Sequence, residues 1–258
     1  MNDQSINSLF NFRKKIVLIT GSSGLIGSSL VNLFLSLGSK VYGFDKVKNK
    51  FLNKHFKFIK TNVASKNSIK KNILKIIKKE KKIDIIINNA GYSIFTKYYN
   101  RTDKEINKTV DVNIKGVSYM INEYSKIHKK FNLKKCNIIN LSSIYGLLSP
   151  DFSIYGKNDR FNSEIYGATK ASVIQLTKYY AVILSKENII INCISPGGIL
   201  NKKNPQAKNF VKNYSKRVPK QRMGNVEDLF TVVLFLSSDK SNYIVGQNII
   251  VDGGLSIW

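Results

Sequence analysis

Residues 16–27, Ile-Val-Leu-Ile-Thr-Gly-Ser-Ser-Gly-Leu-Ile-Gly, constrain the fold more than any other segment of this chain. An apolar strand passes through Gly21, Gly24 and Gly27 into an amphipathic stretch. The first glycine permits a tight turn, the second lets the backbone approach a pyrophosphate, and the third allows the helix to pack closely on the strand. Backbone N–H groups and the positive end of the helix then face a phosphate. The segment predicts a nucleotide-binding strand–turn–helix unit.

Short apolar runs alternate with longer amphipathic stretches along the rest of the chain. The runs expected as strands are 16–20, 40–44, 56–60, 83–88, 136–141, 189–194 and 248–251. The stretches expected as helices are 25–37, 68–79, 106–131, 164–185 and 226–237. Continuous apolar strands with intervening helices indicate a mainly parallel sheet covered on both faces. We therefore expect an α/β protein with a Rossmann-type, doubly wound sheet.

No internal repeat or low-complexity linker divides the chain, so residues 1–258 are expected to form a single domain. Two intervals, 147–163 and 197–223, are too long for simple turns and are expected as loops. Long loops at the carboxyl ends of parallel strands usually shape a ligand site, although surface insertions have the same appearance in a sequence.

A carboxylate follows the second predicted strand. Asp45 lies about 20 residues beyond the glycines, where an acidic side chain accepts a hydrogen bond from an adenosine ribose hydroxyl and repels the 2′-phosphate of NADP. Lys46 and Lys48 follow directly and offer a partner for that phosphate. The sequence favours NAD, and NADP remains the less favoured alternative.

Tyr166 and Lys170 are four residues apart and therefore share one face of a predicted helix. A lysine ammonium beside a phenol favours the phenolate, which predicts a tyrosine that exchanges its proton nearer neutral pH. A solvated helix face would give the same spacing. The apolar strand ending in Ser142 and Ser143, together with the phosphate turn, favours an active site.

With these residues assembled, the chain resembles the short-chain dehydrogenase/reductase family, in its classical single-domain branch, over almost its whole length. The motifs that carry the resemblance are Asn88-Asn-Ala-Gly91, Asn113, Ser143, Tyr166, Lys170, Ser195-Pro-Gly197 and the closing segment 246–254. The resemblance implies a sheet of seven strands, and a homotetramer or homodimer.

The resemblance also assigns catalytic roles. It implies that Ser143 hydrogen-bonds the substrate oxygen and that Tyr166 donates or removes its proton. Lys170 would hold the nicotinamide ribose and lower the tyrosine pKa, and Asn113 would anchor a water in a proton relay. Residues implied to contact the cofactor are Gly21, Ser23, Gly24, Leu25, Ile26, Gly27, Asp45, Asn62, Val63, Asn89, Ala90, Gly91, Tyr166, Lys170, Pro196, Gly197 and Ile199.

Several positions depart from the family pattern. The middle glycine comes one residue earlier than in most single-domain members, Asn62 replaces an acidic residue, and Asn201 replaces a threonine. The largest departure is about ten additional residues between Ser143 and Tyr166, at 150–160. This insertion is similar to that of a subgroup linked to surface-polysaccharide and flagellin-glycan synthesis.

The leading interpretation is an NAD-dependent oxidoreductase that interconverts a secondary alcohol and a ketone by hydride transfer, on a sugar or sugar phosphate. Tyr155, Asp151 and Arg160 would contact the carbohydrate. A phosphate would meet the basic residues of the second long loop, namely Lys202, Lys203, Lys208, Lys212, Lys216 and Arg217. One alternative is a 3-oxoacyl-carrier-protein reductase, whose carrier is acidic. Another, of a different class, is a non-catalytic nucleotide-sensing or nucleic-acid-binding protein.

Charge and composition bear on partners and location. The net charge is +26, yet the lysines are spread along nearly every predicted helix, so nucleic acid is not expected as a partner. Cys136 and Cys193 fit buried apolar positions, and His55 and His128 stand alone, so no metal is expected. No apolar run approaches the roughly 20 residues of a membrane span, and the polar start differs from a signal peptide. We expect a cytoplasmic protein.

Overall fold

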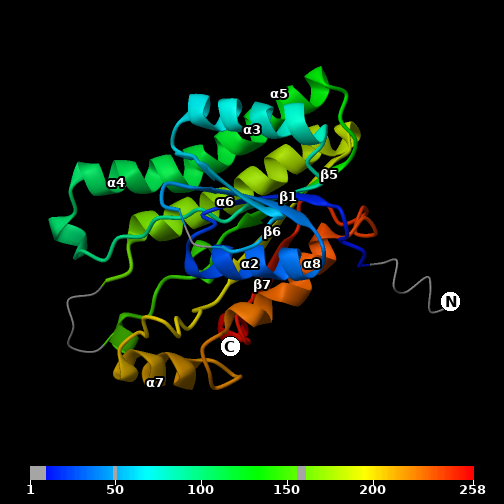
Figure 1. The fold of residues 1–258 in the computed structure, drawn as a ribbon. Coiled ribbons are helices and arrows are strands. Elements are labelled where there is room, and N and C mark those ends of the chain that lie inside the picture. Colours follow the sequence, from blue (N-terminus) through cyan, green and yellow to red (C-terminus); the bar gives the residue numbers. More distant parts are fainter. Residues whose placement is uncertain (1–9, 49–50, 156–160) are drawn as a thin grey trace, which may run out of the picture.

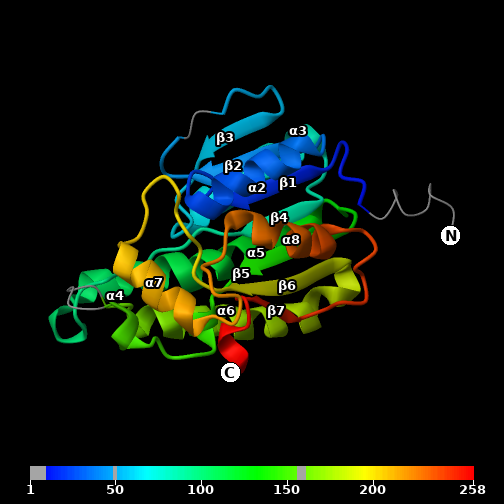
Figure 2. The ribbon, with the colours of Figure 1, turned by 90° about the horizontal axis from the view of Figure 1, so that it is seen from below.

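A computed structural model of the chain describes residues 10–48, 51–155 and 161–258. Seven strands form one sheet in the order β3-β2-β1-β4-β5-β6-β7, and every neighbouring pair is parallel (Figure 2). The strands are β1 (Ile16–Thr20), β2 (Lys40–Asp45), β3 (Phe56–Lys60), β4 (Ile85–Asn88), β5 (Cys136–Leu141), β6 (Ile189–Pro196) and β7 (Asn248–Val251). The predicted Rossmann-type fold is confirmed.

Helices cover both faces of the sheet (Figure 1). On one face, α2 (Leu25–Ser36) and α8 (Phe230–Ser237) pack against the strands around Phe34 and Val233. On the other face lie α3 (Lys66–Glu80), α5 (Gly116–Lys130) and α6 (Glu164–Leu184). Two separate cores result, and the central strands β1, β4, β5 and β6 are buried on both of their faces.

The long helix expected at 106–131 is interrupted. It begins earlier, as α4 (Asp103–Val110), where Thr102 and Glu105 form a capping box. It then passes through a π-helical turn, η2 (Asp111–Lys115), into α5. Single π turns within helices mark functional sites in many proteins, and this one contains Asn113. A hydrophobic period alone gives no signal for such a turn.

The interval 197–223 is not only a loop, because it contains α7 (Lys208–Arg217). Lysines interleave with the apolar residues of α7, which hides its amphipathic pattern in the sequence. The other long interval, 147–163, contains the 3₁₀ turn η4 (Phe152–Tyr155). Of the insertion predicted at 150–160, residues 156–160 lie outside the described residues.

Turn η4 and helix α7 pack together apart from the two main cores. Ile154 and Tyr155 form a third apolar cluster with Tyr214, Val218 and Met223. The rings of Tyr155 and Phe210 are 5.2 Å apart, and an Arg217–Asp151 ion pair of 2.9 Å joins the two segments. The described parts of the two intervals predicted as loops therefore pack against each other, near α7 at the lower left of Figure 1.

The structure also bears on the predictions for the cysteines, the histidines, metal binding and membrane spans. Cys136 and Cys193 are free and buried, as expected for apolar positions. His128 bonds the carbonyl of Lys134 through Nε2 at 2.8 Å. In the three described stretches, no set of three or more His, Cys, Asp and Glu side chains gathers as metal ligands would. A search of the same stretches finds no helix with the length and apolar character that crossing a bilayer requires.

Candidate active site

The phosphate turn follows β1 and has the geometry that its glycines predict. Gly21 has a φ of +65°, a left-handed conformation that favours glycine. A Cβ on Gly27 would lie 2.0 Å from the Gly21 oxygen, so α2 packs too closely for any side chain there. A Cβ on Gly24 would have no contact shorter than 3.4 Å. The absence of a side chain at Gly24 therefore leaves room beside the turn for a ligand.

Asp45, at the end of β2, is held by the phosphate turn. Its carboxylate accepts hydrogen bonds from the backbone N–H groups of Ser23 at 3.0 Å and Lys46 at 2.7 Å. Ser23 donates its hydroxyl to the Val47 carbonyl at 2.6 Å. These bonds fix both the position and the orientation of the negative charge.

A cavity of about 710 Å³ runs along the carboxyl ends of the central strands, from the phosphate turn to the predicted catalytic residues. Most residues predicted to contact the cofactor line it, namely Gly21, Gly24, Leu25, Ile26, Asp45, Val63, Asn89, Ala90, Gly91, Tyr166, Lys170 and Pro196. The room left by Gly24, the N-terminus of α2 and the fixed carboxylate of Asp45 fit a dinucleotide.

Five predicted cofactor residues lie elsewhere. Ser23 and Gly27 stabilise the phosphate turn without lining the cavity. Ser23 bonds the Val47 carbonyl, and Gly27 packs against the Gly21 backbone. Gly197 and Ile199 line a neighbouring cavity instead. Asn62 turns its amide oxygen to the Ala64 N–H at 3.2 Å, while its neighbours Thr61 and Val63 line the wall of the cofactor cavity.

Sequence reasoning missed part of the wall. Lys108 lines the cofactor cavity with its Nζ 4.0 Å from the ring centre of Tyr92. Lys108 reaches the cavity from α4, and nothing in its sequence surroundings distinguishes it from the many surface lysines. Other lining residues that were not predicted are Phe44, Val47, Thr61, Ser93, Val112, Leu141 and Ser142. Lys46, which the sequence offered as a partner for a 2′-phosphate, also lines the cavity.

The predicted catalytic residues come together where β5 ends beside α6. Ser143 begins the short turn η3 (Ile144–Gly146), and this turn packs on the first turns of α6. A Cβ on Gly146 would lie 2.7 Å from the Lys170 backbone, so a glycine is needed for this approach. The contact brings the hydroxyls of Ser143 and Tyr166 within hydrogen-bonding reach.

Lys170 is almost completely buried, with 5% of its surface exposed. Its ammonium donates to the Leu141 carbonyl at 2.8 Å and lies 5.6 Å from the ring centre of Tyr166. Burial lowers the pKa of Lys170 to about 8. The lysine is therefore poised to lose part of its charge in the range where many enzymes work.

The tyrosine pKa corrects a prediction. In the protein without cofactor, burial raises the pKa of Tyr166 above its ordinary value, and the hydrogen bond from Ser143 offsets only part of this shift. The expected lowering by Lys170 is absent because the lysine is itself desolvated and contacts the ring rather than the hydroxyl.

Asn113 is buried in the π-helical turn, with its amide fully engaged. Its oxygen accepts from the Tyr92 N–H at 2.8 Å, and its nitrogen donates to the Tyr92 carbonyl at 2.9 Å and to Thr169 Oγ1 at 2.9 Å. The side chain thus ties the segment after β4 to α6. The predicted role of Asn113 in holding a relay water stays a prediction.

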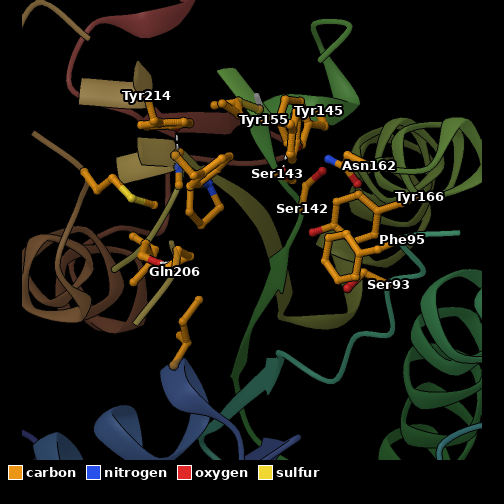
Figure 3. Close-up of a pocket in the computed structure, with 18 of the residues that line it drawn as sticks. Ser93, Phe95, Ser142, Ser143, Tyr145, Tyr155, Asn162, Tyr166, Gln206 and Tyr214 are labelled. Atoms are coloured by element: carbon orange, nitrogen blue, oxygen red, sulfur yellow. Dashed lines mark hydrogen bonds between the residues drawn. The ribbon is translucent and has the colours of Figure 1, made fainter. Parts of the chain in front are cut away.

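A second cavity of about 340 Å³ opens beside Ser143 and Tyr166 (Figure 3). Its walls are largely aromatic or apolar and include Phe95, Phe210 and Met223. Tyr155 of the insertion also lines it. Asp151 instead pairs with Arg217, and none of the basic residues proposed for a sugar phosphate belongs to the described lining.

Comparison with known proteins agrees with this geometry. The family model described as enoyl-(acyl carrier protein) reductase matches residues 44–256. The chain is 32% identical over 257 residues to the 3-oxoacyl-[acyl-carrier-protein] reductase FabG of Thermotoga maritima, covering 94% of this chain and 98% of the relative. The chain belongs to the short-chain dehydrogenase/reductase family. The same enzyme from Buchnera aphidicola is 32% identical, with 94% and 97% covered.

Two solved structures superpose on nearly all of this chain. A short-chain dehydrogenase from Leptospira borgpetersenii with bound NAD+ has a TM-score of 0.90 and 38% identity, with 100% of this chain and 97% of that one covered. ElxO with NADP bound has a TM-score of 0.79 and 28% identity, with 94% and 98% covered. This short-chain dehydrogenase/reductase is thus an NAD(P)-dependent oxidoreductase that acts on CH–OH or keto groups.

Proposed function

We propose that the chain reduces a 3-oxoacyl ester or thioester to the 3-hydroxy compound, with NADH as its preferred cofactor. The aromatic and apolar wall of the substrate cavity carries this proposal, because it suits an acyl chain better than a polyhydroxylated ring. The 3-oxoacyl-carrier-protein reductases among its relatives support the substrate class. Neither the relatives nor the cavity supports the sugar interpretation, so the alternative from the sequence becomes the leading one.

The chain's own residues manage the proton. A bound nicotinamide dinucleotide would supply the hydride-exchanging carbon, and Tyr166 and Lys170 at the end of the cofactor cavity would hold its ribose end. Ser143 donates a hydrogen bond to the carbonyl oxygen and thereby orients it toward Tyr166. Tyr166 then gives its proton to the alkoxide that forms on that oxygen. The raised pKa of Tyr166 keeps the phenol protonated until the substrate needs the proton.

Asp45 favours NADH over NADPH. Its carboxylate lines the cavity and is held by backbone amides, so a 2′-phosphate placed against it would meet a fixed negative charge. Lys46 lines the same wall and is the nearest candidate to offset that repulsion. The bound NAD+ of the Leptospira protein supports NAD, whereas the NADP of ElxO represents the alternative.

We further propose that the protein works as a homo-oligomer. Helix α6 exposes Tyr179, Val182 and Ile183 with 59%, 77% and 50% of their surfaces accessible. The three positions recur at helical spacing and so form one apolar stripe on the outer surface. Stripes of this kind usually mark a protein–protein contact, and the family resemblance makes a second copy of the chain the expected partner.

The test is a reduction assay with the purified protein. The N-acetylcysteamine thioester of 3-oxobutanoate should oxidise NADH, and NADPH should be used less efficiently. Sugar nucleotides carrying a keto group serve as the competing substrate class. Turnover of a keto-sugar nucleotide without turnover of the thioester would overturn the proposed function.

A further inference from the structure

The substrate cavity contains a second group of polar side chains beside the Ser143–Tyr166 pair. Tyr145, Tyr155 and Asn162 all line it, although they come from three different segments (Figure 3). Tyr145 belongs to η3, Tyr155 ends η4, and Asn162 lies two residues before α6. Tyr155 is 9% exposed and Asn162 is 5% exposed, so these two side chains are shielded from bulk water, whereas Tyr145 is half-buried.

Hydrogen bonds within the group fix what it offers to a ligand. Asn162 Oδ1 accepts from the Ser163 N–H at 2.9 Å, which sets the amide so that its nitrogen is the donor on the other side. The hydroxyl of Tyr145 contacts both the Tyr155 hydroxyl and the Asn162 side chain. An amide nitrogen and two adjustable hydroxyls suit a ligand atom that accepts hydrogen bonds.

Gln206, another polar side chain of the cavity wall, is committed to the protein. Gln206 donates its amide nitrogen to the Ile199 carbonyl at 2.9 Å and accepts from the Asn201 N–H at 3.2 Å. It therefore braces the loop after β6, and its amide is used on both sides. Ser93, Ser142 and Tyr214 are further polar side chains in the described lining. Tyr145, Tyr155 and Asn162 differ from them because the three are grouped, with the Tyr145 hydroxyl in contact with the other two side chains.

The group lies next to the catalytic hydroxyls. Tyr145 follows Ser143 by two residues on the same turn. Tyr145 is also close enough to Tyr166 that a negative charge on Tyr145 would raise the pKa of Tyr166. The walls farther along, at Phe210 and Met223, are apolar. A polar substrate group placed against those walls would lose its hydrogen bonds to water, whereas one placed beside Tyr145 and Asn162 would keep equivalent bonds.

We propose that Tyr145, Tyr155 and Asn162 form a subsite for a second oxygen of the substrate, the ester or thioester carbonyl next to the reacting ketone. This inference rests on the proposed function and narrows its substrate class. It makes the enzyme selective for 3-oxoacyl compounds over isolated ketones, because only a substrate with the second oxygen can accept hydrogen bonds from this group.

Two ketones of the same chain length test the subsite. Ethyl 3-oxobutanoate has the second carbonyl, and 2-heptanone replaces its ester group by methylenes. Tyr145→Phe and Asn162→Leu should each raise KM for the ester about tenfold, the effect of losing one hydrogen bond of about 1.4 kcal/mol. The KM for 2-heptanone should change less than about twofold. Tyr243→Phe, at a fully exposed position outside the active site and the α6 stripe, is the matched control and should change neither value.

Binding to a non-reacting enzyme separates this inference from the proposed function. In a Tyr166→Phe background saturated with NADH, quenching of the nicotinamide fluorescence would report the dissociation constant of each ketone without turnover. Weaker binding of the ester alone, in folded variants, supports the subsite even if no ketone is reduced. Equal changes for both ketones, or no binding of the ester, would overturn it, and circular dichroism with NADH titration verifies that each variant is folded.

Discussion

At the scale of single residues, Ser143 and Tyr166 lie together because the turn after β5 packs on α6. Tyr166→Phe should lower turnover by about 10²- to 10⁴-fold, the usual worth of a positioned proton donor. NADH affinity should stay within about twofold, since the ring remains. Stopped-flow reduction and NADH titration measure the two effects. Retention of more than a tenth of the turnover would remove the tyrosine from proton transfer.

Lys170 combines a catalytic position with a cost to folding. Its pKa of about 8 is below that of a lysine in the unfolded chain, so the unfolded state binds more protons between pH 8 and about 10.5. Stability should therefore rise with pH across this window, and the full cost of burying the charge, about 3 kcal/mol, applies below pH 8.

Lys170→Met should consequently make the cofactor-free protein more stable at pH 7, by about 1–2 kcal/mol after the lost bond to the Leu141 carbonyl is counted. Turnover and NADH affinity should fall. Urea denaturation from pH 7 to 10 measures the difference, which should shrink as the pH rises. A variant less stable than the parent at pH 7 would contradict this account.

Asp45 should decide cofactor choice. The parent enzyme should prefer NADH to NADPH in kcat/KM, and Asp45→Ala should reduce that ratio about tenfold, or about 1.4 kcal/mol, because the repulsion of the 2′-phosphate is removed. Lys46→Ala is the companion variant, since Lys46 shares the cavity wall. If the parent prefers NADPH and Lys46→Ala abolishes that preference, the assignment to Asp45 is wrong.

At the scale of elements, the phosphate turn contains two glycines with separable functions. Gly27→Ala places a Cβ 2.0 Å from the Gly21 oxygen and should cost about 1–3 kcal/mol of stability through overpacking, together with cofactor binding. Gly24→Ala meets nothing closer than 3.4 Å, so its stability should be near normal while NADH affinity falls. Thermal unfolding and NADH titration compare the two. Equal loss of stability in both would refute the distinction.

Helix α7 shapes the substrate cavity through its contacts with the loop after β6 and with the insertion. The hydroxyl of Tyr214, on α7, bonds the Gly198 N–H at 2.5 Å, and a Cβ on Gly198 would lie 2.7 Å from the ring of Tyr214. The loop after β6 is thus shaped by α7, which in turn packs on the insertion through Phe210 and Tyr155. Two segments that are about 50 residues apart in the chain, the insertion and α7, therefore form this wall of the cavity together.

At the scale of the whole molecule, the apolar stripe on α6 should hold copies of the chain together. Val182→Lys places a charge in the middle of this stripe and should shift the assembly toward monomers, because burying an unpaired ammonium is costly. Lys57→Glu, exposed on the edge strand β3 away from α6, is the control and should not dissociate it. Sedimentation equilibrium reports the mass. A parent protein that is monomeric at assay concentration would refute the contact.

The sequence by itself determined the parts of this protein that depend on local pattern. The glycine turn of residues 16–27 could be recognised because backbone conformation and phosphate approach permit so few residue types there, and the buried strands because both of their faces require apolar side chains. Ser143, Tyr166 and Lys170 were predicted because motif order and helical spacing place them together. The close packing of η3 on α6, which brings these three side chains together, is visible only in the structure.

Only the tertiary structure decided what surrounds those residues. Burial sets the pKa of Tyr166 and Lys170, and burial is the sum of contacts from segments far apart in the chain. Lys108 and Tyr145 look like any other surface lysine or tyrosine in the sequence, and only the packing of α4 and η3 turns them toward the cavities. The apolar character of the substrate cavity arises in the same way, since packing placed Tyr155 and Phe210 in its wall and left the neighbouring lysines outside.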